Sequence, residues 1–272
     1  MYKRWRKHGR SFDLGRMSLR DLITAYGSHP AVHLYVLLAT ASGIYAVHAA
    51  HGLRPDGLAR LGAAIVVTIL AYPLTWYVLH RFILHGRFLY RWRMTSSLWK
   101  RIHFDHHQDP HRMDVLFGSP LNTAPTILAI LVPLGWLIGG GAAGAAASVC
   151  AGFLITCLYE FCHCVQHLNF KPRNRLLRRM KELHLAHHFH DEEGNYGITS
   201  FAIDRMFGTF YGSVRERPRS PHVFNLGYDL NEAERYPWVA ELSGGPPMDR
   251  PPGHRRPGNR TPASRERTRG TA

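Results

Sequence analysis

Charged residues are missing from three long stretches of this sequence. No Asp, Glu, Lys or Arg occurs from Ala31 to Leu53, from Leu61 to His80 or from Val115 to Tyr159. The third stretch is 45 residues long, enough for two crossings of a hydrocarbon core that takes about 20 helical residues each. The mean hydropathy of −0.20 resembles that of a soluble protein only because the polar remainder of the chain offsets these stretches. The absence of charge therefore predicts a polytopic membrane protein.

Acidic residues and cysteines are also scarce. Nineteen acids against 34 basic residues leave a formal net charge of +15, which taken alone favours nucleic acid or an anionic membrane as a partner. The apolar stretches decide for the membrane, so no nucleic-acid partner is expected. The four cysteines all lie between Cys150 and Cys164, within or at the end of one apolar stretch. This is no secreted disulfide pattern, and we expect them to pack as small apolar side chains.

The apolar pattern predicts four membrane-spanning helices and their orientation. We expect these spans at roughly residues 31–50, 61–79, 121–138 and 142–162. The chain before residue 31, the polar segment at 81–114 and the chain after His163 hold 32 of the 34 basic residues. The two loops on the opposite side hold only Arg54 and Arg60. Because cytoplasmic segments are enriched in Lys and Arg, this bias predicts that both termini and the polar segments are cytoplasmic. The expected fold class is all-α, with four transmembrane helices under a cytoplasmic helical cap.

Composition divides the chain into three parts. Residues 1–30 form a basic head that lacks the residue order of a cleaved signal, and residues 31–242 form the membrane and cap domain. Residues 243–272 contain six prolines, five glycines, seven arginines and no aromatic residue. Such a composition cannot bury a core, so this tail is predicted to be disordered. Residues 195–211, rich in aromatics and glycine, are expected either to cover the site as a packed cap or to lie at the membrane interface.

Ten of the nineteen histidines fall into four clusters at the ends of the apolar stretches and in the polar segments. The clusters are His80 with His85, His103 with His106 and His107, His163 with His167, and His184 with His187 and His188. Spacings of three and four place side chains on one face of a helix, whereas the five-residue step from His80 to His85 predicts a helix end or a break. Neutral imidazole suits zinc, copper, iron and nickel. Ten donors are too many for one ion, so the sequence predicts two metal ions close together, bound by all ten.

The order of these clusters resembles the fatty acid hydroxylase / sterol desaturase superfamily of membrane di-iron enzymes. The stretches most similar to its fatty acid 2-hydroxylase branch are His80-Arg-Phe-Ile-Leu-His85, Tyr159-Glu-Phe-Cys-His163, and His187-His188-Phe189 followed by Tyr196-Gly-Ile-Thr-Ser200 and Asp204. The resemblance covers roughly residues 73–211. It implies two iron ions held by the ten histidines, with zinc as the alternative metal, and O2 as co-substrate for oxidation of a lipid C–H bond.

Residues beside the metal site are predicted from position and from this resemblance. Metal-bound imidazoles usually donate their second N–H to a carboxylate or carbonyl. Glu160 and Asp204 are the main candidates, together with Tyr159, and Glu182 is a further carboxylate close to a cluster. Glu160 stands where the family often has Asp, which keeps a carboxylate at that position. For Glu182 the alternative is an ordinary solvated surface residue.

The resemblance leads us to expect O2-dependent hydroxylation of a lipid acyl chain. Breaking an unactivated C–H bond calls for a metal or cofactor oxidant, and a site at the membrane surface is open to a lipid already in the bilayer. Nothing in the first thirty residues could supply the fused cytochrome b5 domain of many eukaryotic 2-hydroxylases, so a separate electron-transfer protein is expected. Sterol or carotenoid oxidation, desaturation and a non-catalytic zinc protein stay open. A metal transporter would place its histidines near the bilayer midplane rather than at span ends on one side.

Overall fold

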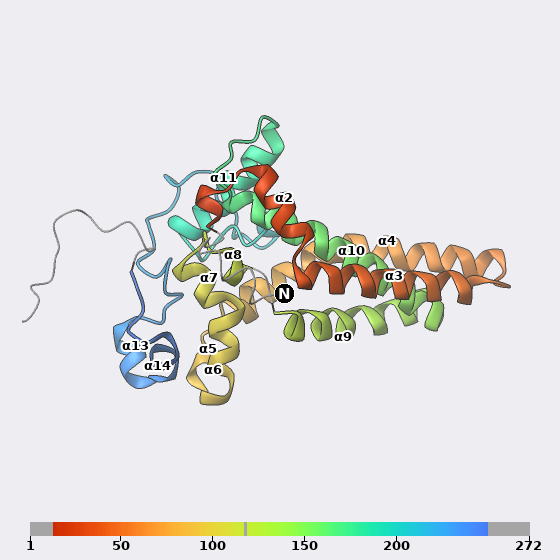
Figure 1. Ribbon diagram of the computed structural model, residues 1–272, viewed down its shortest axis with the longest axis horizontal. Helices are drawn as coiled ribbons and strands as arrows, with labels where there is room; N and C mark the ends of the chain where they lie inside the picture. Colours follow the sequence, from red (N-terminus) through yellow and green to blue (C-terminus); the bar gives the residue numbers. More distant parts are fainter. Residues whose placement is uncertain (1–12, 117–118, 250–272) are drawn as a thin grey trace, which may run out of the picture.

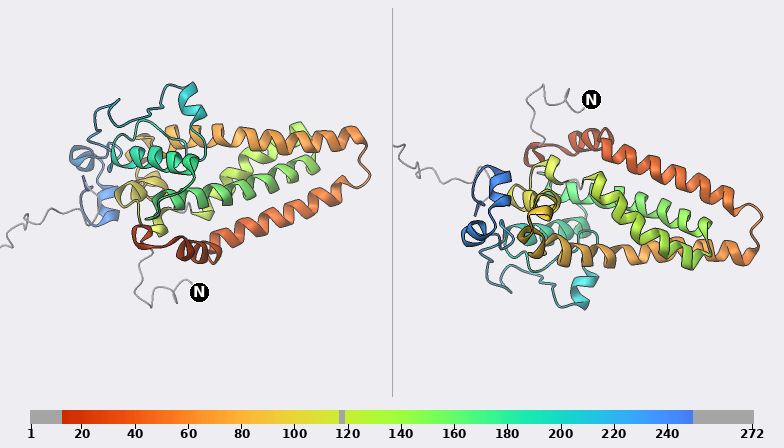
Figure 2. Two further views of the ribbon diagram at one scale, coloured as in Figure 1. Left: turned by 90° about the horizontal axis from the view of Figure 1, so that it is seen from above. Right: turned by 90° about the horizontal axis from the view of Figure 1, so that it is seen from below.

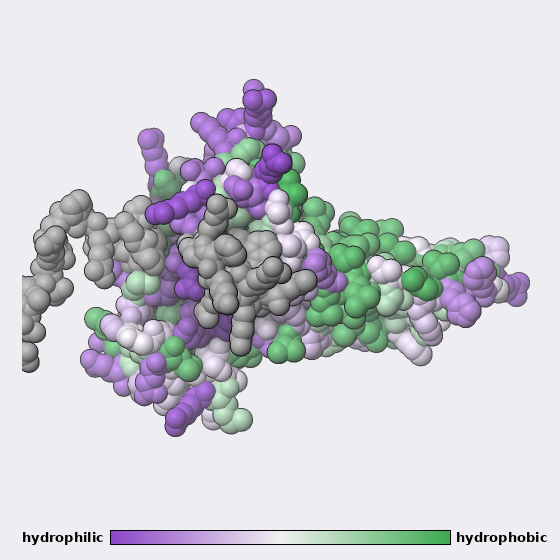
Figure 3. All heavy atoms as spheres, viewed as in Figure 1, coloured by the Kyte–Doolittle hydropathy of each residue, from purple (hydrophilic) through white to green (hydrophobic). Residues whose placement is uncertain are grey.

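The computed structural model describes residues 13–116 and 119–249, which form helices and connecting loops with one isolated β-bridge between Asp13 and Arg112. Four helices are long and apolar enough to cross a membrane, and they run side by side as an elongated bundle (Figure 1). The shorter helices gather at one end of this bundle as a cap. The bundle surface is mainly hydrophobic and the cap mainly hydrophilic (Figure 3). The prediction of an all-helical, four-span membrane protein with a helical cap is confirmed.

The bundle is built around its last helix. Its members are α3 (Pro30–Ala50), α4 (Pro55–Val78), α9 (Pro120–Gly139) and α10 (Ala142–His167). The first three begin with proline, which fits the first helical turn because no backbone N–H is needed there. Helix α10 packs against the other three. It crosses α9 so closely that a Cβ on Gly139 would lie 2.3 Å from the Cα of Gly144, as expected where small residues let two helix backbones approach.

The second span departs from regular α-helix where it reaches the histidines. Helix α4 gives way at Leu79 to η2 (Leu79–Leu84), a π-helical turn in which the His85 N–H donates to the carbonyl of His80 at 3.1 Å. The helical run then ends, so the five-residue step does coincide with a helix change and a helix end. The span itself starts at Pro55 rather than at the predicted residue 61, because Asp56 and Arg60 are tolerated in its exposed first turns.

The cap is assembled from short helices in three parts of the sequence. Before the bundle lie η1 (Leu14–Arg16) and α2 (Leu19–Gly27); between α4 and α9 lie α5 (Phe88–Arg91), α6 (Arg93–Trp99), η3 (Lys100–Phe104), α7 (Asp105–Gln108) and α8 (Met113–Leu116); after α10 lie α11 (Arg175–Phe189), α12 (Ala202–Met206), α13 (Leu230–Arg235) and α14 (Trp238–Ser243). The element η3 is a second π-helical turn. Buried aromatic side chains on α5, α6 and the segment before α13 form one core of the cap, which includes Tyr90, Trp99 and Tyr228.

Parts of the predicted head and tail have defined contacts. Helix α2 is started by a capping box between Ser18 and Asp21, and its Leu22 packs with Cys164 of α10 in one buried cluster. In the tail, the Met248 N–H donates to Gln108 Oε1 at 2.8 Å and the Gln108 side-chain amide donates back to the Met248 carbonyl at 3.0 Å. Residues 1–12 of the predicted head and 250–272 of the predicted tail lie outside the described residues. All four cysteines are free and at least partly buried.

Candidate metal centre

All ten clustered histidines meet where the bundle joins the cap. The ring nitrogens that face one another lie within 4.8 Å in three overlapping sets. We name the first the five-histidine group, made of His106, His163, His167, His184 and His188, and the second the four-histidine group, made of His80, His85, His103 and His187. The third set links the two groups through His107 with His187 and His188. The structure thus brings every predicted ligand together, in two adjoining groups.

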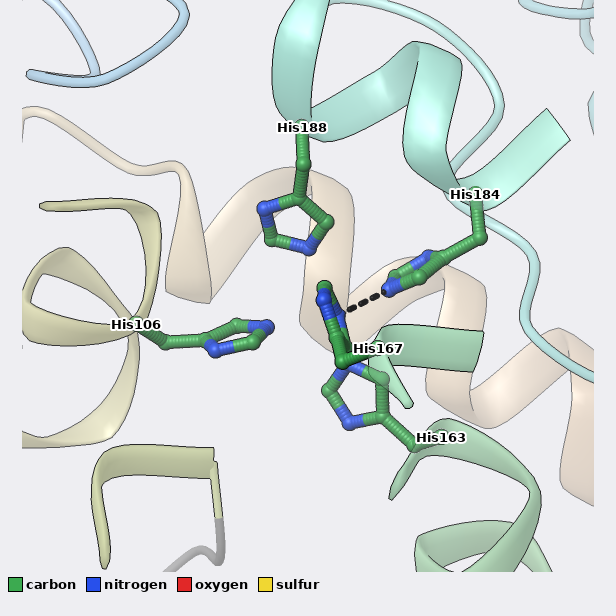
Figure 4. Close-up of side chains that lie close together, drawn as sticks. All are labelled: His106, His163, His167, His184 and His188. Atoms are coloured by element: carbon green, nitrogen blue, oxygen red, sulfur yellow. Dashed lines mark hydrogen bonds between the residues drawn. The ribbon is translucent and has the colours of Figure 1, made fainter. Parts of the chain in front are cut away.

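The five-histidine group combines side chains from three helices. Figure 4 shows His106 from α7, His163 and His167 from the end of α10, and His184 and His188 from α11 pointing toward a common centre. The four-residue steps from His163 to His167 and from His184 to His188 put each pair on one helix face. The Nε2 atoms of His167 and His184 are 2.9 Å apart. Nitrogens this close around one point fit a single ion, since zinc binds imidazole nitrogen at about 2.0–2.1 Å.

The four-histidine group is centred on His103. Its Nε2 lies 3.1 Å from the Nε2 of His80, 3.0 Å from that of His85 and 3.1 Å from that of His107. Both π-helical turns contribute, because η2 carries His80 and η3 carries His103. Such turns often occur at functional sites in helices. Here they aim histidines from two separate helices at one point.

Burial keeps the imidazoles of the cap neutral. It lowers the pKa of His103, His106, His184, His187 and His188 well below the usual histidine range, and neighbouring imidazoles lower each further. Burial also lowers the pKa of His107, to about 3, although its bond to the Val223 carbonyl acts in the opposite direction. A neutral ring keeps a lone pair on one nitrogen, which is the form that binds a metal ion.

Backbone carbonyls orient three of the histidines. The Nδ1 atoms of His80, His107 and His187 lie 2.6, 2.8 and 2.8 Å from the carbonyl oxygens of Tyr196, Val223 and Gly194. An Nδ1–H that donates to a carbonyl leaves the Nε2 lone pair free for a metal ion. All three carbonyls belong to the chain that follows α11. Sequence reasoning missed Gly194 and Val223, because every residue carries a carbonyl and no side-chain pattern marks these two.

The five-histidine group has no comparable anchors. Among the described residues, both nitrogens of His106 and His188, Nε2 of His163, and Nδ1 of His167 and His184 are buried without a hydrogen-bond partner. Leaving a buried polar group unpaired costs about 1–3 kcal/mol. Each of the five rings can offer one nitrogen to the common centre, so five buried imidazoles without carbonyl partners in the described chain fit a bound metal ion, which would accept one lone pair from each. The donor set therefore matches the predicted metal site.

The carboxylates predicted beside the site lie in different surroundings. Asp204 is buried and accepts bonds from the N–H groups of Tyr196 and Gly197, at 2.8 and 2.9 Å, and from the Thr209 hydroxyl at 2.8 Å. Burial raises its pKa, and these three donors oppose the rise. Asp204 thus reaches His80 through the Tyr196 backbone rather than directly. Glu182 is 57% exposed and 3.6 Å from Arg179 on the surface, away from the histidines.

Glu160 and Tyr159 are buried on α10, one turn before His163. One carboxylate oxygen of Glu160 and the hydroxyl of Tyr159 have no hydrogen-bond partner in the described part of the chain. The Tyr159 ring packs edge-on against Trp76 of α4, with ring centroids 4.6 Å apart. No direct bond joins either residue to a histidine. They form a layer on the membrane side of the histidines.

Comparison with known proteins links this arrangement to one family. The family model described as fatty acid hydroxylase matches residues 65–209, a range that contains all ten clustered histidines and Asp204. The chain is 32% identical over 156 residues to dihydroceramide fatty acyl 2-hydroxylase FAH2 of Arabidopsis thaliana, which covers 56% of this chain and 62% of that protein. It is 29% identical over 157 residues to ceramide very long chain fatty acid hydroxylase SCS7 of Saccharomyces cerevisiae, covering 54% and 37%. The matches therefore span less than two thirds of these relatives.

A solved structure is similar in fold. It is described as full-length scs7p with only the hydroxylase domain visible, and it superposes with a TM-score of 0.54 at 22% sequence identity. The superposition covers 76% of this chain and 71% of that one. At this identity the likeness supports the fold, a helical bundle with a helical cap.

Proposed function

Because the chain belongs to the fatty acid hydroxylase family, we propose that it is an integral membrane enzyme that hydroxylates a lipid acyl chain with O2 at a site for two iron ions. The observation that carries this proposal is the convergence of ten histidines, from four separate parts of the chain, into two adjoining groups. Two groups of neutral nitrogen donors fit two ions better than one. Iron rather than zinc is proposed because the relatives are named as hydroxylases.

The roles of the chain's own residues follow from their contacts. Bound iron would supply the activation of O2 and the oxidising power that amino-acid side chains lack. The ten histidines would hold the ions, and the carbonyls of Gly194, Tyr196 and Val223 would fix the ring orientation of three of them. Because nearly all of these rings are buried, bulk water is kept from the site. Glu160 and Tyr159 would lie beside the substrate or the ligands.

The position of the site supports a lipid substrate. The histidines adjoin the ends of α4 and α10, so a molecule already in the bilayer reaches them without leaving the membrane. The relatives named above act on fatty acyl chains of dihydroceramide or ceramide, and an acyl chain is the substrate class that we propose here. Electrons would come from a separate electron-transfer protein on the cap side. We further propose that the cap and both termini face the cytoplasm, from the distribution of basic residues.

Lipid mass spectrometry under 18-oxygen gas tests the proposed reaction. Cells that express the chain should accumulate a lipid with one labelled oxygen on its acyl chain, and cells that express His163→Ala should not. Loss of two hydrogens without label would instead indicate a desaturase. An unchanged lipid profile, together with zinc in both groups of the purified protein, would indicate a non-catalytic metal protein.

A cysteine-labelling experiment tests the orientation. Asp56 lies exposed in the first turn of α4, at the end of the bundle opposite the cap. An Asp56→Cys variant in sealed vesicles should react with a membrane-impermeant reagent added on the non-cytoplasmic side of the membrane. The unmodified protein, with its four native cysteines, is the reference. Reaction only from the cytoplasmic side would reverse the proposed topology.

A further inference from the structure

A short segment of the cap presents two large apolar side chains to its surroundings. Met206, the last residue of α12, is 74% exposed and Phe207 is 53% exposed. Removing large apolar side chains from water is favourable. Two neighbouring exposed residues of this kind are therefore unfavourable on an aqueous surface, and they indicate a surface that another apolar phase covers.

The segment lies beside the end of α4 that carries the histidines. Figure 2 shows α12, in cyan, projecting from the cap next to that end of α4. The Phe207 ring stacks on Tyr77 of α4, with centroids 5.4 Å apart and an interplanar angle of 18°. The Tyr77 and Thr209 hydroxyls are hydrogen-bonded at 3.1 Å, which ties the chain just after Gly208 to the same residue. The position of the segment relative to the spans is thus fixed.

The exposed face of α4 leads directly to this segment. Apolar residues at four-residue steps form an exposed stripe along the helix: Val66, Leu70, Leu74 and Val78. If α4 crosses a membrane, this stripe faces acyl chains. Met206 and Phe207 extend the same apolar surface past the end of the span. Arg81 stands at this border and donates to the Tyr77 hydroxyl at 2.8 Å. A long cationic side chain suits a lipid headgroup boundary, because its stem covers apolar surface while its charge stays in the polar region.

We propose that the segment from Arg205 to Gly208 is a lipid-contacting anchor, which inserts Met206 and Phe207 into the boundary between headgroups and acyl chains next to α4. The occupant is the bilayer itself rather than a protein partner, because the surface is continuous with the lipid-facing stripe of α4. The inference rests on the proposed membrane position of the bundle and is independent of the reaction.

The anchor is connected to the metal centre by hydrogen bonds. Asp204 in α12 binds the N–H groups of Tyr196 and Gly197, and the Tyr196 carbonyl accepts from His80. Met206 is thus two residues along the chain from Asp204, and two hydrogen bonds, through Tyr196, join Asp204 to the predicted ligand His80. Docking of the cap on the membrane and orientation of His80 depend on the same short stretch of chain.

Site-specific photocrosslinking tests the anchor. The full chain carrying Met206→benzoylphenylalanine would be purified, placed in nanodiscs of phosphatidylcholine and phosphatidylglycerol, and irradiated. We expect a mass shift of one phospholipid as the main product. The matched control is Leu242→benzoylphenylalanine, which is 55% exposed on α14, at the end of the cap far from the spans (Figure 1), and should give no lipid adduct.

Two outcomes would overturn the proposal. A crosslink from position 206 to a second copy of the chain would assign this surface to protein contact, and equal lipid adducts at positions 206 and 242 would remove the special role of α12. As a second measurement, Met206→Cys carrying a nitroxide should be more accessible to dissolved oxygen than to a water-soluble nickel reagent. Neither assay needs bound iron or turnover, so a failure of the proposed hydroxylation would leave these results interpretable.

Discussion

The two histidine groups contain the same kind of ligand but are held in different ways. In the four-histidine group, His80 and His187 are oriented by carbonyls of the chain that follows α11, and neighbouring His107 is oriented likewise. In the five-histidine group, the described structure gives the unpaired nitrogens no such partner. The first group therefore depends on the folding of a loop, and the second depends on how helices α7, α10 and α11 pack. The difference predicts that the two groups respond differently to the same kind of perturbation.

Removal of one ligand should have the largest effect and should separate the two groups. His163→Ala takes a donor from the five-histidine group and His103→Ala takes one from the four-histidine group. Each should abolish lipid hydroxylation, because a ligand set that lacks one member no longer closes the geometry around its ion. Iron analysis of the purified proteins should show that each variant loses mainly the ion of its own group. His222→Ala is the control and should keep both ions and activity; full metal content after His163→Ala would contradict the site.

Removal of all metal by a chelator should affect the five-histidine group more strongly. A ligand that binds only the folded state stabilises it by about 2.7 kcal/mol at a hundredfold excess over its Kd, so the melting temperature should fall. Hydrogen exchange should increase most at the end of α10 and in α11, where buried nitrogens lose their only partner. Around Gly194 and Tyr196, carbonyl contacts should persist and exchange should change less. Equal increases in both regions would show that the carbonyl contacts do not hold the group in place.

Asp204→Asn should weaken the four-histidine group alone. The substitution keeps the shape but removes the charge, and its NH2 group cannot accept one of the two bonds from the N–H groups of Tyr196 and Gly197. Substitution of a direct partner of a ligand typically lowers metal affinity about 10–100-fold. Because Asp204 acts through the Tyr196 backbone, we expect a loss near the lower end of this range, about tenfold. Competition with a chromogenic chelator measures it. Glu182→Gln, on the exposed surface, is the control, and a loss of equal size from both groups would show that Asp204 has a general structural role.

Glu160→Gln should have the smallest effect, confined to the five-histidine group. The Glu160 side chain is buried one turn before His163, and one of its oxygens has no described partner. We expect a reduction in metal affinity of up to about tenfold, at the lower end for outer residues, with a larger loss of turnover if the carboxylate faces the substrate. Metal content and turnover at the unmodified level would exclude Glu160 as a partner.

The sequence was informative where chemistry resides in side chains and long apolar runs. Missing charge predicted the four spans, and histidine spacing predicted which residues converge. The division into groups was not predictable, because it cuts across the clusters: His103 joins the group of His80, whereas His106 joins that of His163. These two histidines are three positions apart in a helical stretch that is partly π-helical, and the directions of their rings depend on that local geometry. The carbonyl contacts of Gly194 and Val223 were equally invisible, since they depend on loop conformation.

The π-helical turn at Leu79–Leu84 makes chain length a requirement of its own in this segment. Each residue of an α-helix advances the chain by about 100° around the axis, so a five-residue step would point His80 and His85 about 140° apart. The wider π-helical turn reduces this difference and brings the two rings together, with centroids 5.0 Å apart. Insertion of one more residue would exceed what this turn accommodates, so His85 would point away from His80 and the chain leading to His103 would start in another direction. Phe82 is exposed, so Phe82→Ala should be tolerated, whereas insertion of one alanine after Phe82 should not. Between these two histidines, the number of residues matters more than their identity.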